Sequence, residues 1–159
     1  MIKIFLLVLL FQIGWTQTGK VVSQETKLTG YYPDHSVLEG GFKDRYGQKL
    51  NTLQEFLAGE VPYVSLAMDY KKNMSKYMKT YFCIPQLDKN YAKDMSKAVK
   101  KKYKGHILFK AVDTGQAFIH KKWKKMDICV KDKKASFDER LNIKTSILDC
   151  NQFAKSIKK

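Results

Sequence analysis

Three aspartates lie where stretches of apolar residues begin or end. Asp69 and Asp113 each follow an apolar run of strand length, and Asp127 is the second residue of another. A charged carboxylate beside buried residues costs free energy unless it is hydrogen-bonded or takes part in a reaction there. If these strand ends meet, three like charges at close range raise the pKa of at least one carboxyl, which can then donate a proton at neutral pH. The residues alone leave a second interpretation open, in which each aspartate caps a turn, as Asp113 would before Thr114 and Gly115.

The runs beside these aspartates are typical of short β-strands bounded by turn residues. Strands are expected over residues 27–32, 63–68, 106–112, 126–130 and 141–148. A short helix is expected over residues 53–58, because Thr52 and Glu55 form a capping box before it and Gly59 ends it. Several short strands with an inserted helix predict a mainly β fold, a small β-barrel with α insertions.

The middle of the chain, about residues 70–104, is dominated by lysine, methionine and tyrosine. An apolar or aromatic side chain recurs every four residues at Tyr91, Met95, Val99 and Tyr103, which predicts an amphipathic helix. We therefore expect residues 70–104 to form a Lys-rich helical insertion. Its apolar stripe would pack against the domain, and its basic outer face could contact a polymer.

The chain is strongly basic, with 30 Lys and Arg against 15 Asp and Glu and a net charge of +15. Such a charge favours anionic partners, including acidic glycans, wall polymers, phospholipid headgroups and nucleic acid. A solvated Lys-rich surface without a specific ligand is the competing explanation. Nucleic acid is not expected as a partner, because the N-terminus predicts export.

The N-terminus has the pattern of a cleavable signal peptide. Lys3 provides a positive charge, residues 4–11 are apolar, and Gly14 and Thr16 are small residues at the spacing that signal peptidase requires. The apolar run is shorter than the ~20 residues of a permanent membrane anchor. We expect residues 1–16 to be removed and residues 17–159 to form one secreted domain, extracellular or periplasmic, without a stable membrane span and monomeric.

Export makes a disulfide expected among the three cysteines, Cys83, Cys129 and Cys150. Three pairings are open, and we favour Cys129–Cys150 because both residues lie in the strand-rich C-terminal part. The three histidines are scattered and no C-x-x-C pair is present, so neither a metal site nor a cofactor is expected.

Three short motifs, in this order, resemble the three-aspartate ("3D") domain. They are Ala67-Met-Asp69, Ala111-Val-Asp-Thr-Gly-Gln-Ala-Phe118 and Met126-Asp-Ile-Cys-Val130. The 3D domain is a six-stranded double-psi β-barrel found in membrane-bound lytic transglycosylase A and in the stationary-phase survival muralytic proteins. Gly30-Tyr-Tyr32 also resembles the first barrel strand of double-psi hydrolases and expansin-like proteins. The chain departs from the family pattern at Gln116, which replaces a glycine, and in a longer Lys-rich loop between the second and third aspartates.

The resemblance implies a role for each aspartate. Asp127 would be the general acid/base that protonates the glycosidic oxygen, Asp113 its partner, and Asp69, with Tyr32, would orient the sugar or tune the pKa. Substrate contacts are expected at Tyr31, Tyr32, Thr114, Gly115 and Trp123, of which the aromatic rings could stack on sugars.

The expected function is that of a secreted enzyme that cleaves β-linked glycan, peptidoglycan or a related wall polymer, by lytic transglycosylation or by inverting hydrolysis. The first alternative is a non-catalytic, expansin-like protein that binds a wall polymer through the same surface. A basic effector that binds membranes or nucleic acid is the second alternative, and it depends on charge alone.

Overall fold

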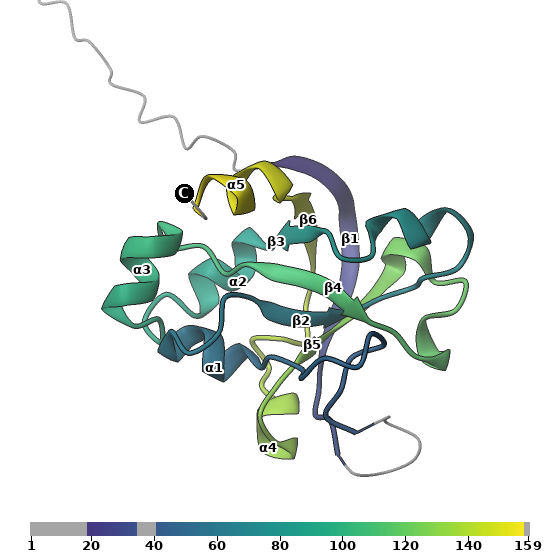
Figure 1. Cartoon of the computed structure of the whole chain (residues 1–159), viewed down its shortest axis with the longest axis horizontal. Helices are drawn as coiled ribbons and strands as arrows, with labels where there is room; N and C mark the ends of the chain where they lie inside the picture. The colour runs from purple at the N-terminus through teal and green to yellow at the C-terminus, as the bar shows by residue number, and fades with distance from the viewer. Residues whose placement is uncertain (1–18, 35–40, 158–159) are drawn as a thin grey trace, which may run out of the picture.

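Six β-strands close into a barrel in the computed structural model, which describes residues 19–34 and 41–157. The strand order around the barrel is β1-β5-β2-β4-β3-β6 (Figure 1). The expected mainly β, six-stranded barrel is confirmed, whereas the expected signal peptide lies outside the described residues. The strands are β1 (Lys20–Tyr31), β2 (Val64–Ala67), β3 (Tyr81–Cys83), β4 (Phe109–Asp113), β5 (Lys125–Cys129) and β6 (Lys144–Asp149).

The barrel mixes parallel and antiparallel neighbours. β1 is parallel to β5 and β2 is parallel to β4, while the other four neighbouring pairs are antiparallel. β1 is long enough to pair with β6 over most of its length and with β5 over its second half. Parallel neighbours require a long crossover, so the strands of each parallel pair are distant in sequence.

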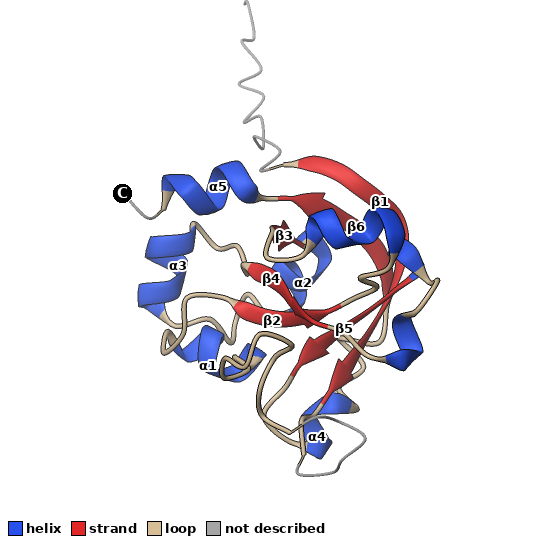
Figure 2. Ribbon diagram, turned by 45° about the vertical axis from the view of Figure 1, so that its right-hand side comes forward, coloured by secondary structure: helices blue, strands red, loops and turns tan. Residues whose placement is uncertain are grey.

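Helices cover the outside of the barrel (Figure 2). The predicted helix is confirmed as α1 (Leu53–Ala58): the Thr52 hydroxyl accepts the backbone N–H of Glu55, the Glu55 carboxylate accepts that of Thr52, and Gly59 follows with φ of 90°. The other helices are α2 (Pro85–Asn90), α3 (Lys97–Tyr103), α4 (Lys133–Ser136) and α5 (Asn151–Ser156), with 3₁₀ helices η1 (Lys72–Tyr77), η2 (Gln116–Phe118) and η3 (Lys122–Lys124). None of the helices in the described part of the chain has the length and apolar character needed to cross a membrane.

The Lys-rich segment differs from the prediction in two ways. One continuous helix through residues 91–103 is wrong, because α2 ends at Asn90 and the Ser96 hydroxyl begins a second helix by accepting the backbone N–H of Val99. The four residues of the predicted apolar stripe are all buried nevertheless. In addition, the segment contains β3, so it contributes a strand to the barrel wall and is more than a helical insertion.

The barrel interior is filled by apolar side chains from every second position of its strands. Leu28, Leu66, Met126 and Ile128 are each fully buried, and Leu28 lies beside Met126 as Leu66 lies beside Ile128. Because side chains alternate between the two faces of a strand, the residues between them point to the outside of the barrel. Asp127, between Met126 and Ile128, is therefore on the outer face.

The disulfide joins Cys83 to Cys150, with their Cα atoms 5.7 Å apart, so the favoured Cys129–Cys150 pairing is wrong. Cys83 ends β3 and Cys150 directly follows β6, and these two strands are antiparallel neighbours. Cys129 is on β5, whose neighbours are β1 and β2, and it is a buried free thiol. The position of two cysteines in the C-terminal part of the sequence did not predict the disulfide, because the barrel places β3 beside β6.

Candidate functional site

Two of the three aspartates lie in one row across the outer face of the barrel. In this aspartate row, Thr29 of β1, Asp127 of β5, Ala67 of β2 and Asp113 of β4 occupy adjacent register positions on four neighbouring strands. Ala67 is paired with Asp127 on one side and, after an irregularity in the β2–β4 register, with Asp113 on the other.

Asp127 has a hydroxyl on one side and a cation on the other. The Thr29 hydroxyl donates a hydrogen bond to its Oδ1, and the ammonium nitrogen of Lys125 lies 3.6 Å from its Oδ2. The side chain is 14% exposed. Burial raises the pKa of Asp127 above its ordinary value, although Thr29, Lys125 and Lys27 each act to lower it. The carboxyl therefore takes up a proton more readily than an exposed aspartate and still reaches the surface.

Asp113 is held by groups from two directions. The Tyr31 hydroxyl donates to its Oδ2 over 2.9 Å, and the backbone N–H of Thr114 also donates to the carboxylate. Burial raises the pKa of Asp113 in spite of these hydrogen bonds, and Asp44 and Arg45, which lie between β1 and α1, exert opposite effects on it: Asp44 raises the pKa and Arg45 lowers it. Tyr31 belongs to β1, so this hydrogen bond joins β1 to β4, two strands that are not neighbours in the barrel.

Cys129 lies beside Tyr31 in the register of β5 and β1. Burial raises the pKa of its thiol to about 12, so the sulfur stays protonated at neutral pH. A protonated, fully buried thiol is a poor nucleophile. The reactive groups of this surface are accordingly its carboxyls.

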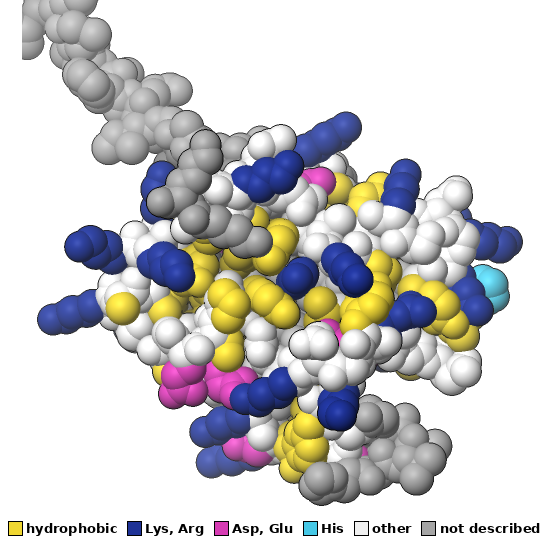
Figure 3. Space-filling view, in the orientation of Figure 1, with side chains coloured by type: hydrophobic (Ala, Val, Ile, Leu, Met, Phe, Trp, Pro, Cys, Tyr) yellow, Lys and Arg dark blue, Asp and Glu magenta, His cyan; other side chains and the backbone are white. Residues whose placement is uncertain are grey.

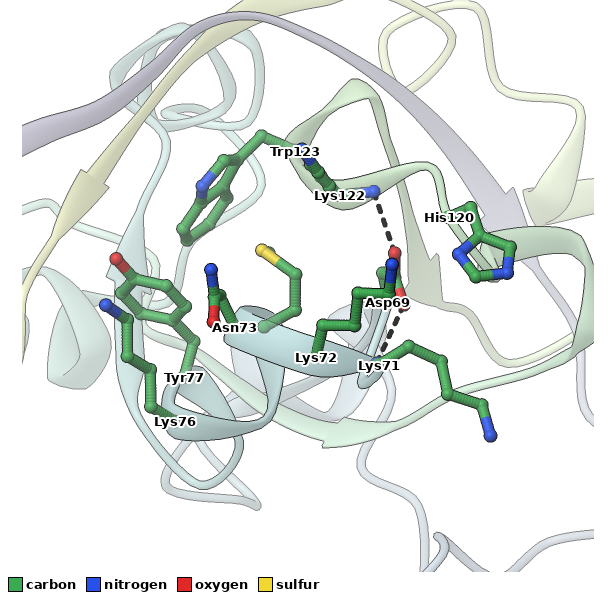
Figure 4. Close-up of a pocket in the computed structure, with 10 residues that line it drawn as sticks. Asp69, Lys71, Lys72, Asn73, Lys76, Tyr77, His120, Lys122 and Trp123 are labelled. Carbon is green, nitrogen blue, oxygen red and sulfur yellow. Dashed lines mark hydrogen bonds between the residues drawn. The ribbon is translucent and has the colours of Figure 1, made fainter.

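Asp69 lies outside the row, in a separate pocket lined by lysines. Its side chain is almost fully buried, and its two carboxylate oxygens accept the backbone N–H groups of Lys71 and Lys122, both over 2.9 Å. These bonds tie the chain after β2 to the loop before β5 (Figure 4). This lysine pocket has a volume of about 310 Å³ and is lined by Asp69, Lys71, Lys72, Asn73, Met74, Lys76, Tyr77, His120, Lys122 and Trp123.

The residues expected to contact substrate are divided between the two places. Tyr31 and Thr114 lie at Asp113, and the Thr114 hydroxyl is buried with no hydrogen-bond partner among the described residues. Gly115 precedes η2 and faces the ring of Phe118. Trp123 lines the lysine pocket, whereas Tyr32 is half-buried and packs against the hydrophobic core. The structure thus groups Asp127, Asp113, Tyr31 and Thr114 near one another and places Asp69 and Trp123 in the pocket.

Thr29 and Arg45 also act on the carboxyls of the row, and the sequence did not single them out, whereas Lys125 belongs to the Lys-rich loop noted before the third aspartate. Thr29 precedes the Gly30–Tyr32 motif, and strand alternation alone places it on the same face as Tyr31. Its partner Asp127 is 98 residues away in sequence, so the hydrogen bond depends on the parallel pairing of β1 with β5. That pairing carries no local sequence signal.

The aspartate row is suited to proton transfer. Two largely buried carboxyls have raised pKa values, and one of them lies beside a lysine that can stabilise its ionised form. No three His, Cys, Asp or Glu side chains are grouped to hold a metal ion within residues 19–34 and 41–157.

No protein-family model matches the chain, and neither a curated protein nor a solved structure is significantly similar to it. Function is therefore inferred from the side chains of the barrel and their surroundings.

Proposed function

We propose that the protein is a secreted enzyme of the 3D type that cleaves β-glycosidic bonds in a wall glycan, peptidoglycan or a related polymer. Asp127 is the general acid/base. The observation that supports this most directly is the state of Asp127: a largely buried carboxyl of raised pKa, fixed by Thr29, beside the Lys125 ammonium and still 14% exposed. A carboxyl with these properties can hold its proton until a substrate oxygen arrives.

The barrel itself is compatible with the double-psi fold that the resemblance implies. It has six strands, and its two parallel pairs, β1 with β5 and β2 with β4, place the ends of β2 and β4 and the middle of β5 at one surface. The three family motifs contribute to β2, β4 and β5, which are consecutive in the barrel order.

In the proposed reaction, protonated Asp127 donates its proton to the glycosidic oxygen. The electron pair of the bond between this oxygen and the anomeric carbon stays on the oxygen, which leaves as a hydroxyl, and positive charge develops on the sugar ring. A hydroxyl of the same sugar then attacks the anomeric carbon and loses its proton to the Asp127 carboxylate. The product is an anhydro sugar, and Asp127 is again protonated.

Lys125 and Thr29 stabilise the intermediate state of Asp127. Once the proton has left, the carboxylate has a cation 3.6 Å away and a hydroxyl donor on its other oxygen. Charge-assisted contacts of this kind are stronger than neutral hydrogen bonds. Both contacts therefore gain strength as the proton is transferred, which is the condition for catalysis by differential binding.

Asp113 is the partner carboxyl in this proposal. β2 is the one strand between β4 and β5, so the two aspartates lie on either side of it. An inverting hydrolase holds its carboxyls roughly 6.5–9.5 Å apart with a water between them. In an inverting route Asp113 activates this water, and the identity of the product distinguishes that route from lytic cleavage.

The test is incubation of residues 17–159 with purified peptidoglycan, with mass spectrometry of the soluble products. We expect anhydro-sugar products from the wild type and a loss of about 100-fold or more in rate for Asp127→Asn, because general acid catalysis contributes roughly that factor. Glu25→Gln is the matched control, since it removes an exposed carboxylate from β1, the strand that carries Thr29 and is paired with β5.

Each outcome assigns a function. Products with reducing ends that depend on Asp127 and Asp113 would replace lytic cleavage by inverting hydrolysis. An absence of products from the wild type, with the protein still sedimenting with the polymer, would overturn cleavage in favour of the expansin-like binding function.

A further inference from the structure

The lysine pocket carries more positive charge than its own residues neutralise. Lys71, Lys72, Lys76 and Lys122 line it, against the single carboxylate of Asp69. Within the described residues, none of these four ammonium groups forms a salt bridge. A concave site lined by charges of one sign concentrates ligands of the opposite sign, so the pocket favours an anionic group.

Asp69 holds the pocket in its open shape. Its hydrogen bonds to the backbone N–H groups of Lys71 and Lys122 fix the two walls relative to one another. Lys72, His120 and Lys122 have φ of 50°, 63° and 50°, a left-handed conformation that non-glycine residues adopt at a cost. Such residues are concentrated at ligand sites. Each carboxylate oxygen has a second lone pair, so Asp69 can also accept a hydroxyl from a ligand.

Aromatic rings form one wall of the lysine pocket. Figure 4 shows Trp123 and Tyr77 on one side of the pocket and Asp69 and His120 on the other. The rings of Trp123 and Tyr77 are 4.6 Å apart in an edge-to-face arrangement, and Trp123 also contacts Phe82 of β3. The indole is therefore held in place by the barrel and offers a flat apolar surface.

We propose that the lysine pocket binds a sugar unit that carries a carboxylate, a uronic acid of a β-linked glycan. The sugar ring lies against Trp123, a ring hydroxyl donates to Asp69, and the carboxylate meets the lysine ammonium groups. The inference rests on the proposed function for the class of ligand, a glycan, and adds that the polymer is acidic. An inorganic anion would leave the aromatic wall and the Asp69 acceptor unused.

Trp123 gives the experiment a direct signal. The chain has two tryptophans, and Trp15 precedes residue 17, so in residues 17–159, which hold every strand of the barrel, indole fluorescence reports on the pocket alone. The ligands are a β-1,4-linked tetramer of glucuronic acid and cellotetraose, which has the same backbone without the carboxylates. The fluorescence titrations use the Asp127→Asn protein at physiological salt, because this variant should not cleave the ligands during the measurement.

We expect the acidic tetramer to bind more tightly than cellotetraose by about tenfold or more, since its carboxylates form charge-assisted contacts. Replacing Lys71, Lys72 and Lys76 together by Gln should remove this preference. Replacing Lys100, Lys101 and Lys102 of α3 by Gln lowers the net charge equally and should preserve it.

Equal affinity for the two tetramers, binding of neither, or equal losses in both triple variants would overturn the uronate site. The last result would assign binding to the net charge of the molecule. Cleavage of peptidoglycan by the wild type is measured separately. If the protein cleaves peptidoglycan but does not prefer the acidic tetramer, only the uronate site is overturned. If it prefers the acidic tetramer but cleaves nothing, only the proposed function is overturned.

Discussion

Lys125 sets the charge environment of Asp127, because its ammonium nitrogen is 3.6 Å from the carboxylate and both side chains project from β5. The cation lowers the pKa of Asp127, and burial raises it by more. Since the acid form donates the proton in the first step, the rate falls as pH rises through this pKa. The position of the alkaline limb therefore measures the balance between the two effects.

Lys125→Met should move the alkaline limb of the pH–rate profile to higher pH. The neutral side chain removes an interaction that lowers the pKa of Asp127, so the acid form persists further into the neutral range. The measurement is initial rate against pH for wild type, Lys125→Met and the exposed neighbour variant Lys124→Met, which should follow the wild type. A limb that moves to lower pH, or moves equally in both variants, would contradict the role of Lys125.

At the residue scale, the sequence identified the two carboxyls of the row but not what holds them. Asp113 and Asp127 were detectable because a charged residue at a strand end stands out against apolar neighbours. Thr29 resembles any threonine in a strand, and its importance follows from the pairing of β1 with β5. Asp69 was detected for the same reason as the others, yet its oxygens accept two backbone N–H groups and shape the lysine pocket.

Gly30 shows how an element depends on a neighbour that lies far away in the chain. It separates Thr29 from Tyr31 on β1, and α4 packs directly against it: a Cβ atom at Gly30 would lie 2.9 Å from the Cα of Ser136. That distance is too short for two carbon atoms of a close-packed interior. Because Gly30 has no side chain, α4 can approach β1, the strand whose Thr29 and Tyr31 donate hydrogen bonds to the two aspartates.

Gly30→Ala should lower the free energy of unfolding by roughly 1–3 kcal/mol, the usual cost of overpacking, because backbone atoms of α4 must move. Gly115→Ala is the matched control: its Cβ would meet the Phe118 ring at 3.6 Å, an ordinary contact, and should change stability little. Urea denaturation of both variants provides the comparison. Equal free energies of unfolding for the two variants would contradict this prediction and show that α4 can move without loss of stability.

Elements with local signals were predicted well, and those that depend on tertiary contacts were not. The cap at Thr52 and the stop at Gly59 defined α1 because both act within a few residues. β3 has three residues, too few for an alternating pattern, and its pairing with β4 and β6 is entirely non-local. The four-residue repeat predicted one helix, but it reflects only which side chains are buried against the core. A turn at residues 91–96 buries Tyr91 and Met95 just as a helix would.

For the whole molecule, the disulfide fastens β3 to the end of β6. Cys83 and Cys150 are 67 residues apart in sequence, so the cross-link removes considerable freedom from the unfolded chain. Positive charge is spread over the surface, as Figure 3 shows for one face, and it repels itself in the compact state. The covalent link acts against that repulsion.

Replacing Cys83 and Cys150 together by Ser should lower the free energy of unfolding by about 2–5 kcal/mol, as for other native disulfides in small domains. Urea denaturation of this variant should coincide with that of the reduced wild type. Cys129→Ala, which leaves the disulfide intact, is the control and should remain sensitive to reductant. A wild type whose denaturation midpoint does not respond to reductant would contradict the stabilising role.

The order of strands has a further consequence for how the barrel is made. β1 is the first strand to be synthesised, and both of its neighbours, β5 and β6, are the last two. Until residue 144 exists, the strand has an unsatisfied edge that could pair with another nascent chain. Lys20, Glu25 and Lys27 are exposed along it and discourage such pairing. These charges therefore act before the fold exists, by protecting a strand whose partners have not yet been translated.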